Sequence, residues 1–282
     1  MYKSKLEEFS EAISVDLIKH GTLSDEETIR DTAIAQPLIV GASIATAALL
    51  DTTNVSGVAG HSVGEVAAAA ISGVLSQSDA IKLVDARAKA MAAAASSGEA
   101  TSMAAILGGD IESVVSKLTE LGLSAANYNG AGQIVAAGSK AGIDRLASEG
   151  IEGSKVIPLS VAGAFHTQYM LPAVGELEQF LPTITVSDPA IKLWSNQNGQ
   201  LVSSGQEFVN LLVGQIANSV RWDLCMEALV NAGVSAVIEL SPAGTLAGLA
   251  KRGMPGVEIV ALREPSDLEA AQDLINRSTK KV

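Results

Sequence analysis

The chain has 282 residues, of which 48% are hydrophobic and 18% are charged, so a globally disordered chain is excluded. Its net charge of −12 argues against a nucleic acid or an anionic membrane surface as the main partner. The single cysteine, Cys225, excludes an internal disulfide and a cysteine-cluster metal site, and it suits a reducing compartment.

The N-terminal sequence has no apolar signal core behind its basic residues, so we expect a cytoplasmic protein. The most apolar stretch, 33–50, lacks charge and is long enough to raise the question of a membrane span. Pro37 lies inside it, however, and small or hydroxylated residues dilute its hydrophobicity. A buried helix beginning at Pro37 is the better interpretation, and no membrane partner is predicted.

The first hundred residues predict helices around one short strand. We expect helices over 6–17, after 37, over 66–71 and over 80–95, with a strand at 55–59.

From residue 103 the pattern changes to short alternating strands and helices. Strands are expected at 103–107, 124–128, 134–137 and 155–161, and helices at 111–121 and 141–148. This βαββαβ order predicts a small ferredoxin-like subdomain over 101–162. Strands at 191–194 and 236–240 and a helix at 208–215 then resume the larger pattern, so residues 1–100 and 163–282 are expected to form one large α/β domain.

Gly60-His61-Ser62-Val63-Gly64 matches the nucleophile-elbow motif G-x-S-x-G, with a predicted strand before it and a helix after it. Glycines on both sides allow a sharp turn, and the helix N-terminus offers backbone N–H groups to a developing oxyanion. A chance match in a Gly-rich chain is the alternative. The context favours Ser62 as a nucleophile and a large domain with a hydrolase-like parallel sheet.

A serine nucleophile needs a base, and the chain has three histidines. His20 lies in an early helix and is expected at the surface. His61 adjoins the serine, and its place on the turn suits a packing or orienting role. His166 follows the last strand of the small subdomain in a loop suited to a converging site, which makes it the best candidate, although a structural histidine is the alternative.

Arg87 is the third candidate. On the predicted helix Lys82, Asp85 and Lys89 share one face, and Arg87 lies roughly opposite. A buried guanidinium needs an anion. The anion is either a structural partner, such as Glu65, or a substrate carboxylate held by two hydrogen bonds.

Together these residues resemble the malonyl-CoA:acyl carrier protein transacylase family over nearly the whole chain. Besides the elbow and Arg87, the resemblance covers Ala35-Gln36-Pro37, Asn127 to Gln133, Gly163-Ala164-Phe165-His166, Ser195-Asn196, Gln215 with Val220-Arg221-Trp222, and Glu239 to Leu246.

The resemblance implies a role for each matching residue. Ser62 is the nucleophile and His166 the base, which the backbone carbonyl of Gln215 orients. Arg87 binds the malonyl carboxylate, and the Val63 N–H serves the oxyanion. Three further residues complete the implied binding site: Asn129 and Asn196 near the acyl or pantetheine end, and Phe165, which favours malonyl over methylmalonyl.

Two departures from the family pattern stand out. Gly163 replaces the first histidine of a His-Ala-Phe-His signature. Family members also open with a strand and a Gly-Gln-Gly-x-Gln loop that supplies a second oxyanion donor, and this chain begins after it. The simplest explanation for the missing strand and loop is a shortened sequence.

The implied reaction is transfer of malonyl from malonyl-CoA to the pantetheine thiol of acyl carrier protein, in fatty-acid or polyketide synthesis, with no metal and no bound cofactor. Because carrier proteins are usually acidic, we expect a local basic patch at Lys251 and Arg252. Two alternatives remain: a non-catalytic binding module for acyl-CoA or carrier protein, and an α/β-hydrolase esterase. The esterase expects a histidine near the C-terminus, and none follows His166.

Overall fold

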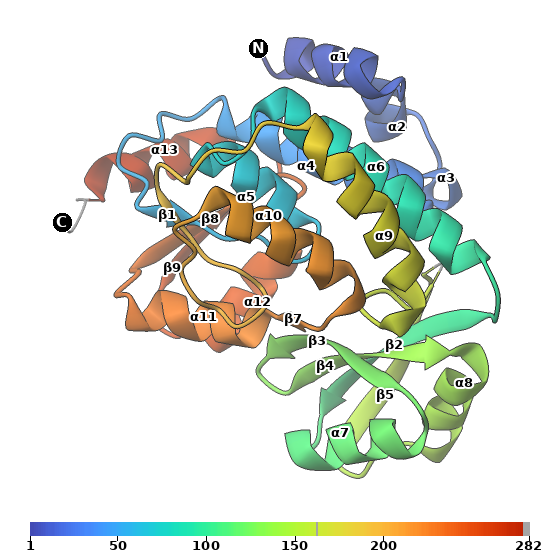
Figure 1. The fold of residues 1–282 in the computed structure, drawn as a ribbon. Helices are drawn as coiled ribbons and strands as arrows, with labels where there is room; N and C mark the ends of the chain where they lie inside the picture. The colour runs from blue at the N-terminus through green and yellow to red at the C-terminus, as the bar shows by residue number, and fades with distance from the viewer. Residues whose placement is uncertain (162, 279–282) are drawn as a thin grey trace.

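The computed structural model describes residues 1–161 and 163–278, which form a mixed α/β fold. A larger upper part carries most of the helices, and a smaller part lies below it (Figure 1). Residue 162, the last of the predicted small subdomain, lies outside the described residues.

Four helices open the chain: α1 (Tyr2–Ile13), α2 (Leu17–Thr22), α3 (Glu26–Arg30) and α4 (Thr32–Ala47). The single helix predicted over 6–17 is wrong, because α1 ends at Ser14 in a left-handed conformation, with φ of 56°. The Asp16 side chain then accepts the Lys19 N–H and begins α2.

The predicted start of the next helix at Pro37 is also wrong. The Asp31 side chain accepts the Ala33 N–H and caps α4 at its N-terminus, so that Pro37 lies inside the helix. Within the described residues, no helix combines the length and apolar character that crossing a membrane requires.

The upper part contains two short pairs of parallel strands. β1 (Gly57–Val58) pairs with β6 (Lys192–Leu193), and β8 (Ala236–Glu239) pairs with β9 (Glu258–Ala261). The predicted strands at 55–59 and 191–194 are therefore correct in place but shorten to two residues. The remaining helices of this part are α5 (Gly64–Ser72), α6 (Gln77–Ser96), α9 (Leu171–Phe180), α10 (Gly205–Gly214), α11 (Trp222–Asn231), α12 (Thr245–Gly253) and α13 (Asp267–Arg277), with 3-10 turns η1 (Gln168–Met170), η2 (Leu181–Thr183) and η3 (Gln215–Ala217).

A continuous apolar core joins the helices of the upper part. Fully buried side chains from α1, α4, α6 and α10 meet in it, among them Phe9, Ile44, Ile81 and Phe208. Burying one such side chain contributes roughly 1.5–3 kcal/mol, so this core fixes the position of α6 and its polar side chains.

The lower part is built on a five-stranded sheet with the order β5-β2-β4-β3-β7. Two helices pack on it: in Figure 1, α7 (Ile111–Glu120) lies below the sheet and α8 (Lys140–Glu149) lies at its right. Its strands are β2 (Thr101–Gly108), β3 (Ser124–Gly130), β4 (Gln133–Ser139), β5 (Ser154–Leu159) and the parallel edge strand β7 (Val220–Arg221). β7 comes from the later chain, so the sheet joins the two parts.

Candidate active site

The turn between β1 and α5 presents Ser62 in a strained left-handed conformation, with φ of 51°. At Gly60 an added Cβ would lie 2.0 Å from the Gly64 carbonyl carbon, so only glycine fits there. At Gly64 an added Cβ would meet no atom within 4 Å. The sharp turn therefore depends on the glycine before the serine, and the two glycines of the motif are not equivalent.

The Ser62 hydroxyl lies 2.7 Å from His166 Nε2. On the other side of the ring, Nδ1 lies 2.8 Å from the Gln215 backbone carbonyl in η3. Because a carbonyl oxygen only accepts, Nδ1 carries the proton and Nε2 is left to accept the proton of the serine. Three residues that are far apart in sequence thus lie in the arrangement that a nucleophile, a base and an orienting group require.

His166 is neutral in this arrangement. Burial and the nearby positive charge of Arg87 lower the pKa of His166 to about 3. The imidazole therefore has an unprotonated Nε2 throughout the neutral pH range.

Arg87 projects from α6 toward the same point and is 1% exposed. Its NH1 donates to the Gln36 side-chain oxygen, and its NH2 lies 3.1 Å from Gln215 Oε1 and 3.4 Å from Ser62 Oγ. Its Nε is buried without a partner. Among the described residues none of the hydrogen-bond acceptors of this guanidinium is a carboxylate, so direct pairing with Glu65, one of the two alternatives, is absent.

Glu65 nevertheless lies close by, 1% exposed in the first turn of α5. Burial raises the pKa of Glu65, against the opposing effects of the Asn196 N–H and the Arg87 charge. Both oxygens of its side chain accept hydrogen bonds, from the Asn196 N–H and from Gln215 Nε2, which is the pattern of an ionised carboxylate. Burial likewise lowers the pKa of Arg87 to about 10, which leaves the guanidinium charged at neutral pH.

Asn196, after β6, holds the serine turn. Its Oδ1 accepts the Ser62 backbone N–H at 2.7 Å, and its Nδ2 donates to the Gly60 carbonyl at 2.7 Å. Both ends of this amide therefore contact the turn itself.

His61 and Asn129 connect the turn to the lower sheet. His61 Nε2 lies 2.9 Å from Asn129 Oδ1 on β3, and the ring packs edge-on against Trp222 at 5.7 Å. Burial lowers the pKa of His61. These contacts agree with the packing and orienting role expected for His61.

Phe165 lies directly before His166 and packs against both the upper core and the sheet of the lower part. At Gly163 an added Cβ would lie 2.5 Å from the Ala95 Cβ on α6. Gly163, which departs from the family signature, therefore allows α6 to approach closely at this point.

Two residues of this site received no role from the sequence. In the sequence Gln36 stands out only as part of the tripeptide Ala35-Gln36-Pro37, and Glu65 only as a structural partner for Arg87. Both are polar side chains buried by distant segments, which no local pattern predicts.

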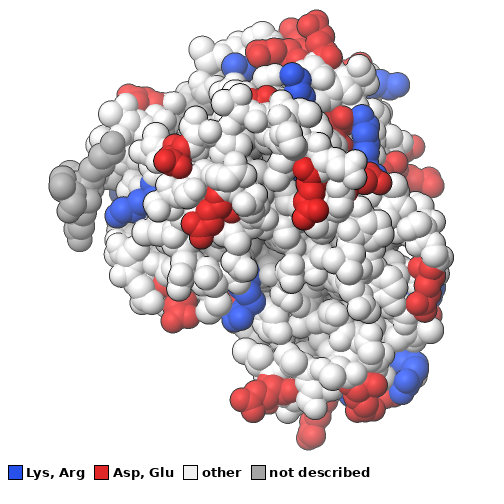
Figure 2. Space-filling model, viewed as in Figure 1, with Lys and Arg blue, Asp and Glu red and all other residues white. Residues whose placement is uncertain are grey.

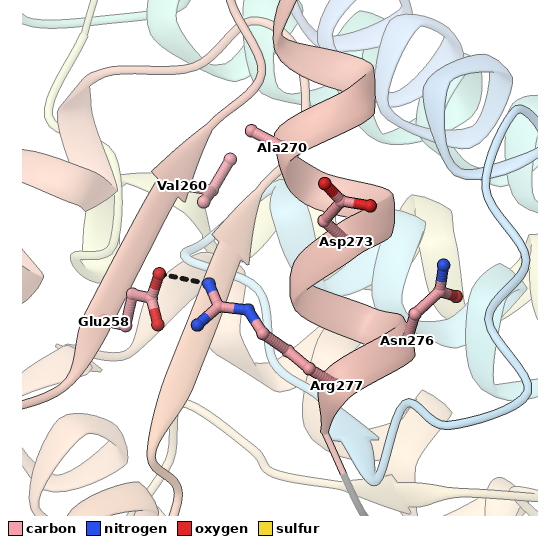
Figure 3. Close-up of a pocket in the computed structure, with 6 residues that line it drawn as sticks. All are labelled: Glu258, Val260, Ala270, Asp273, Asn276 and Arg277. Atoms are coloured by element: carbon pink, nitrogen blue, oxygen red, sulfur yellow. Dashed lines mark hydrogen bonds and ion pairs between the residues drawn. The ribbon is translucent and has the colours of Figure 1, made fainter.

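The site lies where the two parts of the molecule meet, because it joins α5 and α6 to β3 through His61 and Asn129. Figure 2 shows a hollow between the upper and lower parts, with few charged groups across it. A hollow of about 680 Å³ elsewhere lies between β9 and α13 and is crossed by the Glu258–Arg277 ion pair of 2.5 Å (Figure 3). None of the site residues lines it.

Comparison with known proteins shows which family the chain belongs to. The family model described as an acyl transferase domain matches residues 9–264. The malonyl CoA-acyl carrier protein transacylase of Mycobacterium tuberculosis is 43% identical over 272 residues, covering 94% of this chain and 89% of that protein. The protein of the same name from Bacillus subtilis is 34% identical, covering 88% and 80%.

Solved structures give the same result. The crystal structure of the M. tuberculosis protein superposes with a TM-score of 0.92 at 42% identity, covering 96% of this chain and 91% of that one. A malonyl-transacylase in complex with a type II polyketide synthase acyl carrier protein superposes with a TM-score of 0.89 at 29% identity, covering 97% and 91%. The chain therefore belongs to the acyl transferase family, among the malonyl CoA-acyl carrier protein transacylases.

Proposed function

We propose that this protein transfers a malonyl group from malonyl-CoA to the pantetheine thiol of an acyl carrier protein, through a malonyl ester of Ser62. The observation that carries the proposal is the buried, uncompensated guanidinium of Arg87 3.4 Å from a serine that is paired with a neutral histidine. A plain esterase needs the serine and the histidine but not this arginine.

In the first half-reaction His166 Nε2 accepts the Ser62 proton while Oγ attacks the thioester carbon. The Val63 N–H, at the N-terminus of α5, stabilises the oxyanion. The carbon–sulfur bond then breaks, and His166 returns the proton to the CoA sulfur. In the second half the pantetheine thiol gives its proton to His166 and attacks the malonyl ester, and Ser62 leaves with that proton.

Arg87 binds the malonyl carboxylate in this proposal. Its two amide partners, Gln36 and Gln215, are neutral, and its Nε donor is unpaired, so a substrate carboxylate can supply the missing negative charge. Phe165 beside the base restricts the acyl group, in favour of malonyl over methylmalonyl. Asn129 and Asn196 remain assigned to the acyl or pantetheine end, although the contacts of Asn196 favour a role in holding the serine turn.

We assign the finer architecture on the same basis. A hydrolase-like parallel-sheet domain, 1–100 and 163–282, carries an inserted ferredoxin-like subdomain, 101–162. The element order β2-α7-β3-β4-α8-β5 and the strand order β5-β2-β4-β3 support the insert. The strand β7 supports an intimate contact between the two.

Several further assignments accompany the function. The steps above need only side chains, backbone groups and the two substrates, so we assign no metal and no cofactor. We also assign a cytoplasmic location. The solved complex of a related transacylase with its carrier protein supports an acyl carrier protein as the acceptor.

The test is intact-protein mass spectrometry after mixing with malonyl-CoA, with Ser62→Ala as the control. We expect a malonyl increment in the parent protein that disappears in Ser62→Ala and transfers to added holo acyl carrier protein. Binding of malonyl-CoA without any increment would instead favour the non-catalytic binding module.

A further inference from the structure

Glu65 is buried against two segments that together present three hydrogen-bond donors. Its Oε1 accepts the Asn196 backbone N–H at 2.6 Å, and its Oε2 accepts Gln215 Nε2 at 2.6 Å. The Ser195 hydroxyl is a third hydrogen-bond partner. No step of the reaction uses this carboxyl group, yet a buried carboxyl group is costly to retain.

The amide of Gln215 lies between this carboxylate and Arg87. Its Nε2 faces Glu65, and its Oε1 accepts from Arg87 NH2 at 3.1 Å. If the amide turned over, its oxygen would face the carboxylate and its NH2 would face the guanidinium, so both contacts would become repulsive. Glu65 and Arg87 therefore select one orientation of the amide.

We propose, on the basis of the function proposed above, that Glu65 is a positioning residue that sets the orientation of the Gln215 amide and thereby the substrate-binding guanidinium of Arg87. The neutral amide also separates the two charges, so the guanidinium meets an oxygen without being neutralised by it. The malonyl carboxylate then finds a guanidinium that is oriented and still charged.

Replacing Glu65 by glutamine tests this directly, because it puts an NH2 group where only an acceptor fits. The Asn196 N–H is part of the backbone and cannot turn, so the oxygen of the new amide stays there and its NH2 faces Gln215. The Gln215 amide must then either turn over, so that Arg87 loses its acceptor, or keep its Nε2 against a second NH2 group, so that nothing holds its Oε1 toward Arg87.

The measurement is the rate of Ser62 acylation by malonyl-CoA and by acetyl-CoA, which differ only in the carboxylate. We expect Glu65→Gln to lower the malonyl-to-acetyl rate ratio by about tenfold or more, toward the ratio of Arg87→Ala. The matched control is Glu239→Gln, whose carboxylate accepts backbone N–H groups of α12 away from this network, and its ratio should equal that of the parent.

An unchanged ratio in folded Glu65→Gln, whether both rates fall together or neither falls, would overturn the proposal. Absence of malonyl-enzyme in the parent protein would instead overturn the proposed function, so the two failures are distinguishable.

If Glu65→Gln does not fold, a double variant that combines Glu65→Gln with Gln215→Glu can be used. It restores one donor and one acceptor to the buried contact between residues 65 and 215. It also places a carboxylate directly on Arg87. We expect the malonyl-to-acetyl ratio to fall again, and a ratio equal to that of the parent protein would contradict the proposed separation of charges.

Discussion

Two strand-to-helix turns of the upper part use a glutamate in opposite ways. After β8, Glu239 accepts the backbone N–H groups of Gly244, Leu246 and Ala247, all at 2.7–2.8 Å, and so caps the start of α12. After β1, Glu65 contacts Asn196 and Gln215, and the N-cap residue of α5, Val63, makes no side-chain cap bond.

The difference explains what each turn can do. A helix whose first N–H groups are satisfied by a carboxylate of the preceding strand is stable but has little to offer a ligand. At α5 the carboxylate is held by other segments, so it does not compete with a substrate for the helix N-terminus. The turn between β1 and α5 is therefore stabilised by contacts with distant segments, whereas the turn between β8 and α12 is stabilised by a carboxylate within it.

The largest expected effect comes from Gly60→Ala, which should break the first turn. The new Cβ would overlap the Gly64 carbonyl at about 2 Å, so we expect a loss of more than about 3 kcal/mol in the free energy of unfolding and loss of the malonyl-enzyme. Denaturant unfolding and intact-protein mass measure the two effects.

Gly64→Ala is the matched control for this prediction. Its Cβ meets no atom within 4 Å, so the variant should fold as stably as the parent protein. Equal stability of the two alanine variants would contradict the steric account of the turn.

Glu239→Ala should weaken only the second turn. Three backbone N–H groups at the start of α12, those of its N-cap Gly244 and of Leu246 and Ala247, lose their acceptor, and we expect a loss of about 1–3 kcal/mol in the free energy of unfolding. The acylation rate of the folded protein should stay as it is. A reduced acylation rate at full stability would mean that the two turns are energetically coupled.

The helix after the second turn ends with Lys251 and Arg252, the basic residues expected to contact an acidic carrier protein. Reversing both charges to glutamate should raise the KM for acyl carrier protein roughly several-fold and leave acylation by malonyl-CoA unchanged. Lys3→Glu on α1 is the control charge reversal. An unchanged KM for the carrier protein would remove this patch from the docking surface.

The smallest expected effect is on the pH dependence at the first turn. Since the pKa of His166 is lowered from 6.5 to about 3, the base stays unprotonated as the pH falls from 7.5 to 5. The kcat/KM for acylation of Ser62 should therefore remain nearly constant over that range. A decrease centred near pH 6.5 would show that the imidazole titrates normally.

The lower part was the easier half to predict from sequence. Its strands alternate with helices at short intervals, and each predicted strand lies within three residues of the observed one, from β2 (Thr101–Gly108) to β5 (Ser154–Leu159). Local apolar patterns suffice there because each element buries its face against its neighbours.

The upper part was harder because its short strands and buried polar groups depend on distant partners. β1 and β6 pair over only two residues, and the cap of α4 by Asp31 outweighs the helix-start signal of Pro37. The roles of Gln36 and Glu65 were missed for a similar reason, since a buried glutamine or glutamate has the same local sequence as an exposed one.

The sequence by itself determined the chemical groups of the site: a serine between glycines after a strand, one suitable histidine and an arginine on the inner face of a helix. Motifs of this kind can be recognised in a sequence because the local backbone conformation depends on adjacent residues. Only the tertiary structure decided how these groups are held, with Asn196 on the serine turn, Gln215 between Glu65 and Arg87, and no carboxylate on the guanidinium. Those contacts join segments up to about 150 residues apart, and their hydrogen-bond directions follow from burial rather than from any local pattern.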